Sequence, residues 1–167
     1  MHIFENVCTE EFLMEIQEDL SIKLKQSLPD HISSVSHWDA SLLVGIEGKS
    51  TQITIDNHIS KKMRNIIIKK VPEVYQCNMA MSYQIMPYKS GISKHSDGNK
   101  KFGATLYLNK HWDIDYGGLL IYEDDGLKAL CPKYNTLMIN TPKHLHLVTA
   151  VTNAAPESRI TLQIFGV

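Results

Sequence analysis

The sequence is poor in the features that mark secreted, membrane-bound and zinc-stabilised proteins. Its three cysteines lie far apart and form no C-x-x-C pair, so neither a disulfide framework nor a zinc knuckle is expected. No uninterrupted apolar stretch approaches the ~20 residues that a membrane span needs. The N-terminus lacks a basic start followed by an apolar run, so no signal peptide is expected. We therefore expect a cytoplasmic protein with reduced thiols and no membrane partner.

An excess of charge of one sign is also absent. The chain has 17 basic and 18 acidic residues, which give a formal net charge of -1. Such a balance gives no electrostatic reason to expect binding to nucleic acid or to an anionic membrane. The length of 167 residues suits one domain, and the 43% of hydrophobic residues suits a soluble globular core.

Two amphipathic helices are expected in the first half of the chain. The first covers residues 9–28, where Thr9 can cap the helix and Glu10 and Glu11 suit its dipole. Its apolar stripe has helical spacing and consists of Phe12, Leu13, Ile16, Leu20, Leu24 and Leu28. The second helix covers residues 58–70 and ends before Pro72. Residues 32–46, with short apolar runs, favour one or two strands.

Beyond residue 78 the pattern changes to short strands separated by turn residues. The expected strands are 80–86, 92–97, 103–109, 118–123, 128–131, 136–140, 144–151 and 159–165. Eight closely spaced strands after two helices predict a mainly β fold, a double-stranded β-helix (a cupin-like jelly-roll barrel) buttressed by the helices. We expect one domain over residues 1–167, with helices and first strands in 1–78 and the catalytic jelly-roll core in 79–167.

The last expected strand has two different faces. Ile160, Leu162 and Ile164 form an aliphatic face that can pack on the helices, and the opposite face begins with Arg159. That mixed face, which would point into the barrel, consists of Arg159, Thr161, Gln163 and Phe165. A buried charge costs several kcal/mol unless it has a partner, and a bound carboxylate would be one.

A histidine and an aspartate two residues apart, His95 and Asp97, form an H-x-D motif. A strand points residues i and i+2 to one face, so both side chains can reach one metal ion. His146 on a neighbouring strand would complete two imidazoles and one carboxylate, the set that binds one side of an octahedral iron(II) and leaves positions open. The motif alone is weak, because eight histidines and 18 acidic residues make a chance match common.

Several segments in a fixed order strengthen this interpretation. They are Tyr88-Lys89-Ser90-Gly91, Tyr107-Leu108-Asn109, Trp112, Gly117-Gly118, His146-Leu147-Val148-Thr149-Ala150-Val151 and Arg159-Ile160-Thr161. With the H-x-D motif they resemble the 2-oxoglutarate/iron(II) dioxygenases, most closely the prolyl-4-hydroxylase-like branch, over about residues 80–167. Gly117-Gly118 itself is expected to form a turn or bulge where strands approach closely, since no helix follows it.

The resemblance implies a role for each matching residue. The metal ligands and catalytic residues would be His95, Asp97 and His146. Arg159 would pair with the distal carboxylate of 2-oxoglutarate, a geometry that guanidinium suits. The rest of that pocket would comprise the hydroxyls of Thr161 and Tyr107 and the apolar side chain of Leu120. His144 competes with His146 for the metal, and we favour His146 because it begins the H-x-V-x-x-V pattern.

The implied activity is an oxygenase reaction. Its cofactor and co-substrates would be Fe(2+), 2-oxoglutarate and O2, with ascorbate as a reductant, and the products would include succinate and CO2. The substrate would be a peptide or protein residue, such as a prolyl residue, or a small molecule such as an amino acid. Two alternatives stay open: a nucleic-acid or damage-repair demethylase of the same superfamily, and a jelly-roll binding module without turnover. The near-neutral charge argues against nucleic acid.

Overall fold

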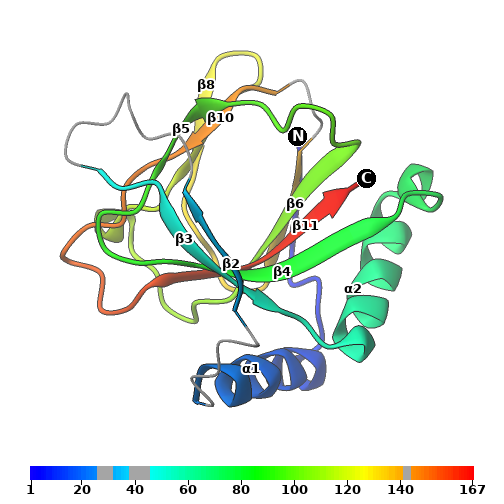
Figure 1. Ribbon diagram of the computed structural model, residues 1–167. Helices are drawn as coiled ribbons and strands as arrows, with labels where there is room; N and C mark the ends of the chain where they lie inside the picture. The colour runs from blue at the N-terminus through cyan, green and yellow to red at the C-terminus, as the bar shows by residue number, and fades with distance from the viewer. Residues whose placement is uncertain (26–31, 38–45, 141–143) are drawn as a thin grey trace.

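The computed structural model describes residues 1–25, 32–37, 46–140 and 144–167, with only the backbone described for 32–37. Two antiparallel sheets dominate these ranges. The larger has seven strands in the order β1-β9-β6-β11-β4-β3-β2, and the smaller has four in the order β5-β10-β7-β8. Figure 1 shows the small sheet across from the large one, with both helices on the outer side of the large sheet. Within the described ranges the two sheets are separate ladders and do not close into one continuous barrel.

The helices and strands that were expected from the sequence occur in the expected order along the chain. The large sheet comprises β1 (His2–Glu5), β9 (Thr136–Asn140), β6 (Phe102–Tyr107), β11 (Arg159–Gly166), β4 (Met79–Met86), β3 (Lys49–Thr54) and β2 (Ile32–His37). The small sheet comprises β5 (Ile92–His95), β10 (His146–Val148), β7 (Leu120–Glu123) and β8 (Leu127–Leu130). The helices are α1 (Glu10–Lys25) and α2 (Asn57–Lys70), with short 3-10 turns η2 (Pro72–Val74) and η3 (Ile114–Tyr116). No described helix has the length and apolar character that crossing a membrane requires.

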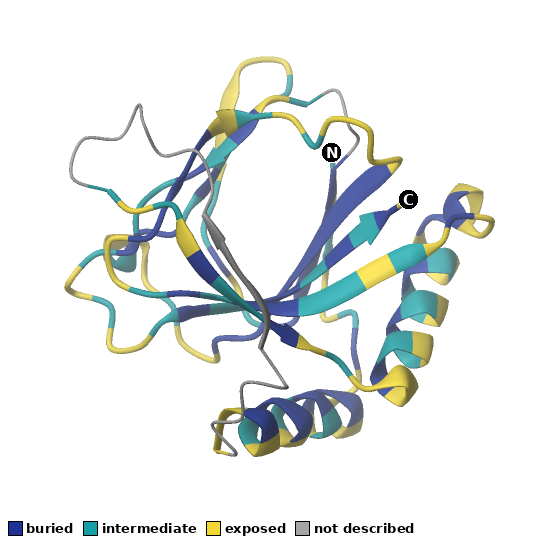
Figure 2. Cartoon of the chain, in the orientation of Figure 1, coloured by how far each residue is buried: buried dark blue, intermediate teal, exposed yellow. Residues whose placement is uncertain are grey.

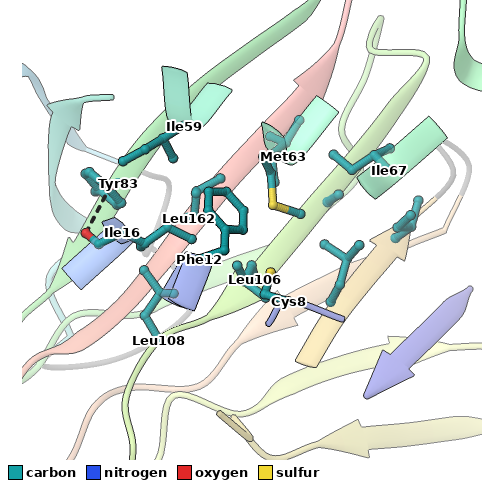
Figure 3. Close-up of a cluster of buried hydrophobic side chains, with 14 of the residues drawn as sticks. Cys8, Phe12, Ile16, Ile59, Met63, Ile67, Tyr83, Leu106, Leu108 and Leu162 are labelled. Carbon is teal, nitrogen blue, oxygen red and sulfur yellow. Dashed lines mark hydrogen bonds between the residues drawn. The ribbon is translucent and has the colours of Figure 1, made fainter. Parts of the chain in front are cut away.

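The main hydrophobic cluster lies between the helices and the outer face of the large sheet. Figure 3 shows Phe12 and Ile16 of α1 and Met63 of α2 packed against Leu106 and Leu162 of the sheet. Thr9 caps α1 as expected, because its hydroxyl accepts a hydrogen bond from the Phe12 amide at 3.3 Å. The helical stripe is confirmed as far as Leu20.

Leu24 departs from the expected stripe. It is 45% exposed and lies at the rim of a groove that Leu108 and Ile160 also line. The buried positions of this part of α1 are taken instead by Asp19 and Lys23, which form an ion pair at 2.6 Å. The Tyr83 hydroxyl donates a hydrogen bond to Asp19 at 2.8 Å and ties β4 to α1.

A second hydrophobic cluster lies between the two sheets. It joins Met86, Tyr107 and Met138 of the large sheet to Leu120 and Val148 of the small sheet. Figure 2 shows that β6 and β11 are buried along most of their length, whereas each helix exposes one side. The two faces of β11 confirm the expectation, because Leu162 and Ile164 contact the helix cluster while Arg159 faces the space between the sheets.

All eight strands expected beyond residue 78 are present, and only their ends differ. The expected strand 144–151 forms its ladder only at His146–Val148, and the expected strand 92–97 ends at His95. β1 and β3 were not expected, although 32–46 was expected to hold strands and β2 covers its first part. Residues 26–28 of the expected first helix, and 38–45, lie outside the described residues.

Candidate active site

Three possible metal ligands converge on the small sheet. His95 at the end of β5 is paired directly with His146 at the start of β10, so their ring centroids lie 4.4 Å apart. Asp97 follows β5 by two residues, and its Oδ1 lies 3.7 Å from Nε2 of His146. One ligand atom from each of the three residues lies within 4.8 Å of the other two. This spacing allows one metal ion to contact all three.

Backbone carbonyls fix the orientation of both imidazole rings. Nδ1 of His95 lies 2.8 Å from the Ser93 carbonyl, and Nδ1 of His146 lies 3.0 Å from the His144 carbonyl. An Nδ1–H that donates to a carbonyl leaves Nε2 as the unprotonated nitrogen, which is the usual arrangement around a metal-ligating histidine. In both rings Nε2 is therefore the nitrogen that would coordinate a metal ion.

Burial lowers the pKa of the His146 imidazole. The nearby imidazoles of His95 and His144 lower it further, while the His144 carbonyl and the Asp97 carboxylate oppose the shift. A lowered pKa keeps the ring neutral at neutral pH, which is the form that binds a metal ion. His144 contributes its carbonyl to this arrangement and lies outside the group of three converging ligands.

Arg159 begins β11 and is buried in the same pocket as these ligands, with 3% of its surface exposed. Its Nη1 donates to the Met86 sulfur at 3.4 Å, and its Nε makes no hydrogen bond with any described residue. The guanidinium carbon lies 5.2 Å from the ring centroid of Tyr107. Burial lowers the pKa of Arg159, and no carboxylate within the described ranges forms an ion pair with it. An unneutralised buried cation of this kind fits an anionic ligand.

Two hydroxyls accompany this cation. Tyr107 on β6 and Thr161 on β11 are paired across the ladder, and their buried hydroxyls make no hydrogen bond of normal geometry within the part of the chain that the structure describes. Burial raises the pKa of Tyr107, and the nearby charge of Arg159 opposes the rise. Tyr107 and Leu120 line the pocket, whereas Thr161 is fully buried outside the described lining.

Gly117 and Gly118 bring the segment before β7 close to Arg159. Gly118 has a φ of 64°, and a Cβ built on it would lie 2.7 Å from Cδ of Arg159. A Cβ on Gly117 would collide with the Ala150 carbonyl, and the Gly117 carbonyl accepts a hydrogen bond from the Trp112 indole at 2.9 Å. The expected close approach of strands at this pair is confirmed, and it forms one wall around the guanidinium.

Two further residues at this site were not expected from the sequence. Asn140 ends β9 and Gly103 lies in β6, and both line the pocket beside Asp97. An asparagine and a glycine in ordinary strands carry no signal in a single sequence. The pairing of β6 with β9 places them side by side, next to the possible metal ligand Asp97.

Comparison with solved structures identifies the fold. A prolyl-4-hydroxylase from Pseudomonas putida superposes with a TM-score of 0.68 at 13% identity, covering 99% of this chain and 90% of that chain. A prolyl hydroxylase from Trichoplax adhaerens, in complex with a hypoxia inducible factor peptide fragment, gives 0.70 at 16% identity, covering 99% and 82%. A 2OG-Fe(II) oxygenase family oxidoreductase from Burkholderia pseudomallei gives 0.66 at 15% identity, covering 98% and 83%.

The chain has the fold of the 2-oxoglutarate/iron(II) oxygenases. The resemblance drawn from the ordered motifs is thereby confirmed at the level of the fold, and two of these neighbours are prolyl hydroxylases. No protein-family model matches the chain, and no curated protein matches it in sequence. The similarity to known proteins is therefore a similarity of fold, at 13–16% sequence identity.

Proposed function

We propose that the protein is a 2-oxoglutarate- and Fe(II)-dependent dioxygenase that hydroxylates an unactivated C–H bond. The observation that carries the proposal is that one pocket contains both the His95, Asp97 and His146 group and Arg159. Arg159 is buried there and has no carboxylate partner among the described residues. Two imidazoles and a carboxylate are the donor set of non-haem iron(II) oxygenases. The unneutralised guanidinium supplies the complementary feature, a binding site for a carboxylate.

Each residue of the pocket has a distinct task in this proposal. His95, Asp97 and His146 would hold the iron, and Arg159 would bind the distal carboxylate of 2-oxoglutarate. The Tyr107 hydroxyl would donate to the same carboxylate, and Thr161, paired with Tyr107 across the ladder but outside the pocket lining, would supply a supporting hydroxyl. Leu120 would pack on the methylene groups of the co-substrate and keep water away from it.

The bound iron and 2-oxoglutarate would supply the oxidising chemistry, in which O2 converts 2-oxoglutarate to succinate and CO2 and transfers one oxygen atom to the substrate. The protein contributes binding, orientation and exclusion of water. Ascorbate is proposed as the reductant that keeps the iron in the Fe(II) state.

A peptide or protein residue is the proposed class of substrate, with prolyl residues first. The support is the Trichoplax adhaerens neighbour, whose structure contains a bound peptide fragment. A free amino acid or another small molecule is the alternative within the same reaction class. A nucleic-acid demethylase is disfavoured by the net charge of -1, because phosphate binding depends on an excess of basic residues.

Succinate formation tests the activity directly. The wild-type protein, supplied with Fe(II), 2-oxoglutarate and ascorbate in air, should form succinate, and proline-containing peptides should raise the rate. Asp97→Ala should form none above background, because two histidines hold the metal poorly. A wild-type protein that forms no succinate, with or without peptide, would contradict the proposal and favour a binding module that lacks turnover.

Ligand-induced stabilisation provides an independent test that needs no substrate. Manganese and 2-oxoglutarate at a hundred times their dissociation constants should each add about 2.7 kcal/mol to the free energy of unfolding. For a chain of this size such a gain raises the melting temperature by roughly 5–10 °C. Differential scanning fluorimetry measures this shift, and an unchanged melting temperature with both ligands would count against the pocket assignment.

A further inference from the structure

The carboxylate of Asp97 rests on a cross-strand pair of residues from the large sheet. Gly103 of β6 and Asn140 of β9 lie directly opposite each other in the ladder. Asp97 follows a strand of the other sheet, so this pair is the point where the large sheet supports a proposed metal ligand. Asn140 is 1% exposed, and the Asp97 side chain is 7% exposed.

The two oxygens of Asp97 face different surroundings. Oδ1 is the oxygen directed at His146, 3.7 Å from its Nε2. Oδ2 points the other way and accepts a hydrogen bond from Nδ2 of Asn140 at 3.2 Å. A Cβ added to Gly103 would lie 2.5 Å from that same Oδ2, so any larger residue there would displace the carboxylate. Oδ2 is therefore held by a hydrogen bond to the large sheet, whereas Oδ1 faces the candidate metal site.

Packing alone does not explain an asparagine at this position. The residues before it in β9 include Leu137, Met138 and Ile139, all buried and apolar. The Oδ1 of Asn140 is buried without a hydrogen-bond partner in residues 1–25, 32–37, 46–140 and 144–167. A buried amide that is only partly satisfied destabilises a fold relative to an apolar side chain of the same shape. Its amide instead donates to a proposed ligand, the Asp97 carboxylate.

We propose that Asn140 and Gly103 are positioning residues that make Asp97 a ligand through one oxygen only. Asn140 holds Oδ2 by its amide hydrogen, and Gly103 leaves the space that this orientation needs. A carboxylate that is free to rotate could bind through both oxygens and occupy a position that exogenous ligands require. The inference rests on the proposed function, because it assumes that a metal ion binds at His95, Asp97 and His146.

The test measures metal binding without turnover. Manganese affinity is determined by calorimetric titration of the metal-free protein, and the ligand field of bound cobalt(II) is recorded by absorption spectroscopy. Asn140→Leu removes the amide at nearly constant volume, and Gly103→Ala displaces Oδ2 without altering Asn140. Thr136→Val is the matched control, because Thr136 is buried in the same strand with the same strand parity and its hydroxyl has no partner among the described residues.

Loss of an outer hydrogen bond to a metal ligand commonly lowers metal affinity by roughly 10–100-fold. Asn140→Leu and Gly103→Ala should each weaken manganese binding by this amount and alter the cobalt spectrum. Thr136→Val should stay within about twofold of wild type with an unchanged spectrum. The double variant should lose less than the sum of the two, because both substitutions release the same carboxylate. Circular dichroism of the metal-free variants confirms folding, and Gly103→Ala carries the test alone if Asn140→Leu does not fold.

The outcomes separate this inference from the proposed function. Wild-type affinity and spectrum in both Asn140→Leu and Gly103→Ala would overturn the positioning role while leaving the metal centre intact. An equal loss in Thr136→Val would also overturn it, because the effect would then be general to the strand. A wild-type protein that binds neither manganese nor cobalt would instead refute the proposed metal centre itself.

Discussion

Replacing Arg159 by methionine is expected to move protein stability and 2-oxoglutarate affinity in opposite directions. Methionine has a similar length and fills an apolar site flexibly. Arg159 is 3% exposed, has no ion-pair partner among the described residues and leaves its Nε without a hydrogen bond. Replacing a buried ion pair by well-packed apolar residues is often neutral or stabilising by about 1–4 kcal/mol, and an unpaired buried charge has even less to offset the cost of its desolvation. The metal-free variant should therefore unfold at an equal or higher urea concentration than wild type.

The same substitution should weaken co-substrate binding strongly. Removing one partner of a buried charge pair costs about 3–5 kcal/mol, because the other charge stays uncompensated. A loss of 3 kcal/mol corresponds to on the order of a hundredfold in the dissociation constant. Tyr107→Phe should lose less, about 1.5–3 kcal/mol, because it removes one hydrogen bond to a charged group. Manganese affinity should stay near wild type in both variants.

Two measurements decide the matter. Urea unfolding of the metal-free proteins gives the change in stability, and calorimetric titration of the manganese-loaded proteins gives the affinity for 2-oxoglutarate. Arg159→Lys serves as the companion variant, since it keeps the charge and loses the planar fork, and its affinity should be intermediate. The reasoning is refuted if Arg159→Met destabilises the metal-free protein and binds 2-oxoglutarate as wild type does, because Arg159 would then be a structural residue.

Three further predictions follow from the same geometry. His146→Ala should abolish manganese binding in a calorimetric titration, whereas His144→Ala should retain it; the reverse result would reassign the ligand. Gly118→Ala should lower 2-oxoglutarate affinity about tenfold or more, comparable to about 1–2 kcal/mol of strain, because its Cβ would meet Arg159 at 2.7 Å. Burial and the hydrogen bond to the Asp19 carboxylate raise the pKa of the Tyr83 hydroxyl. The folded protein therefore keeps the hydroxyl proton above pH 10, whereas the unfolded chain loses it. Stability should then fall by about 1.4 kcal/mol per pH unit above pH 10 from this group, and urea unfolding should show a shallower fall in Tyr83→Phe.

Secondary-structure elements that depend on a local residue pattern could be predicted from the sequence. The strand over Arg159–Gly166 alternates between apolar and mixed residues, and turn residues separate the strands around it. The positions of these strands can therefore be predicted from the two-residue periodicity and from the turn residues between them. The grouping of His95, Asp97 and His146 could also be predicted, because strand spacing and motif order both indicate it. The assignment of catalytic and co-substrate roles to these residues stays a prediction.

The features that could not be predicted depend on contacts between distant segments. β3 consists mostly of polar residues, Lys49–Thr54, and its pairing with β4 decides its structure, whereas its own apolar pattern does not. The support of Asp97 by Gly103 and Asn140 arises from the register of β6 against β9, which no local signal encodes. Leu24 was placed in the core by helical spacing, but α1 turns this position toward the rim of a groove.

The position of β11 has a consequence for synthesis of the chain. Arg159–Gly166 comes last in sequence among the described strands, yet it lies between β6 and β4 in the large sheet. A ribosome therefore delivers this strand after both of its neighbours, and until it emerges each of them has an unpaired edge that could recruit another chain. Because Arg159 begins the same strand, the nascent protein gains its buried cation only when the gap in the sheet is filled. A chain that still lacks this strand therefore already has the three candidate metal ligands, but it has no Arg159 for the proposed carboxylate site.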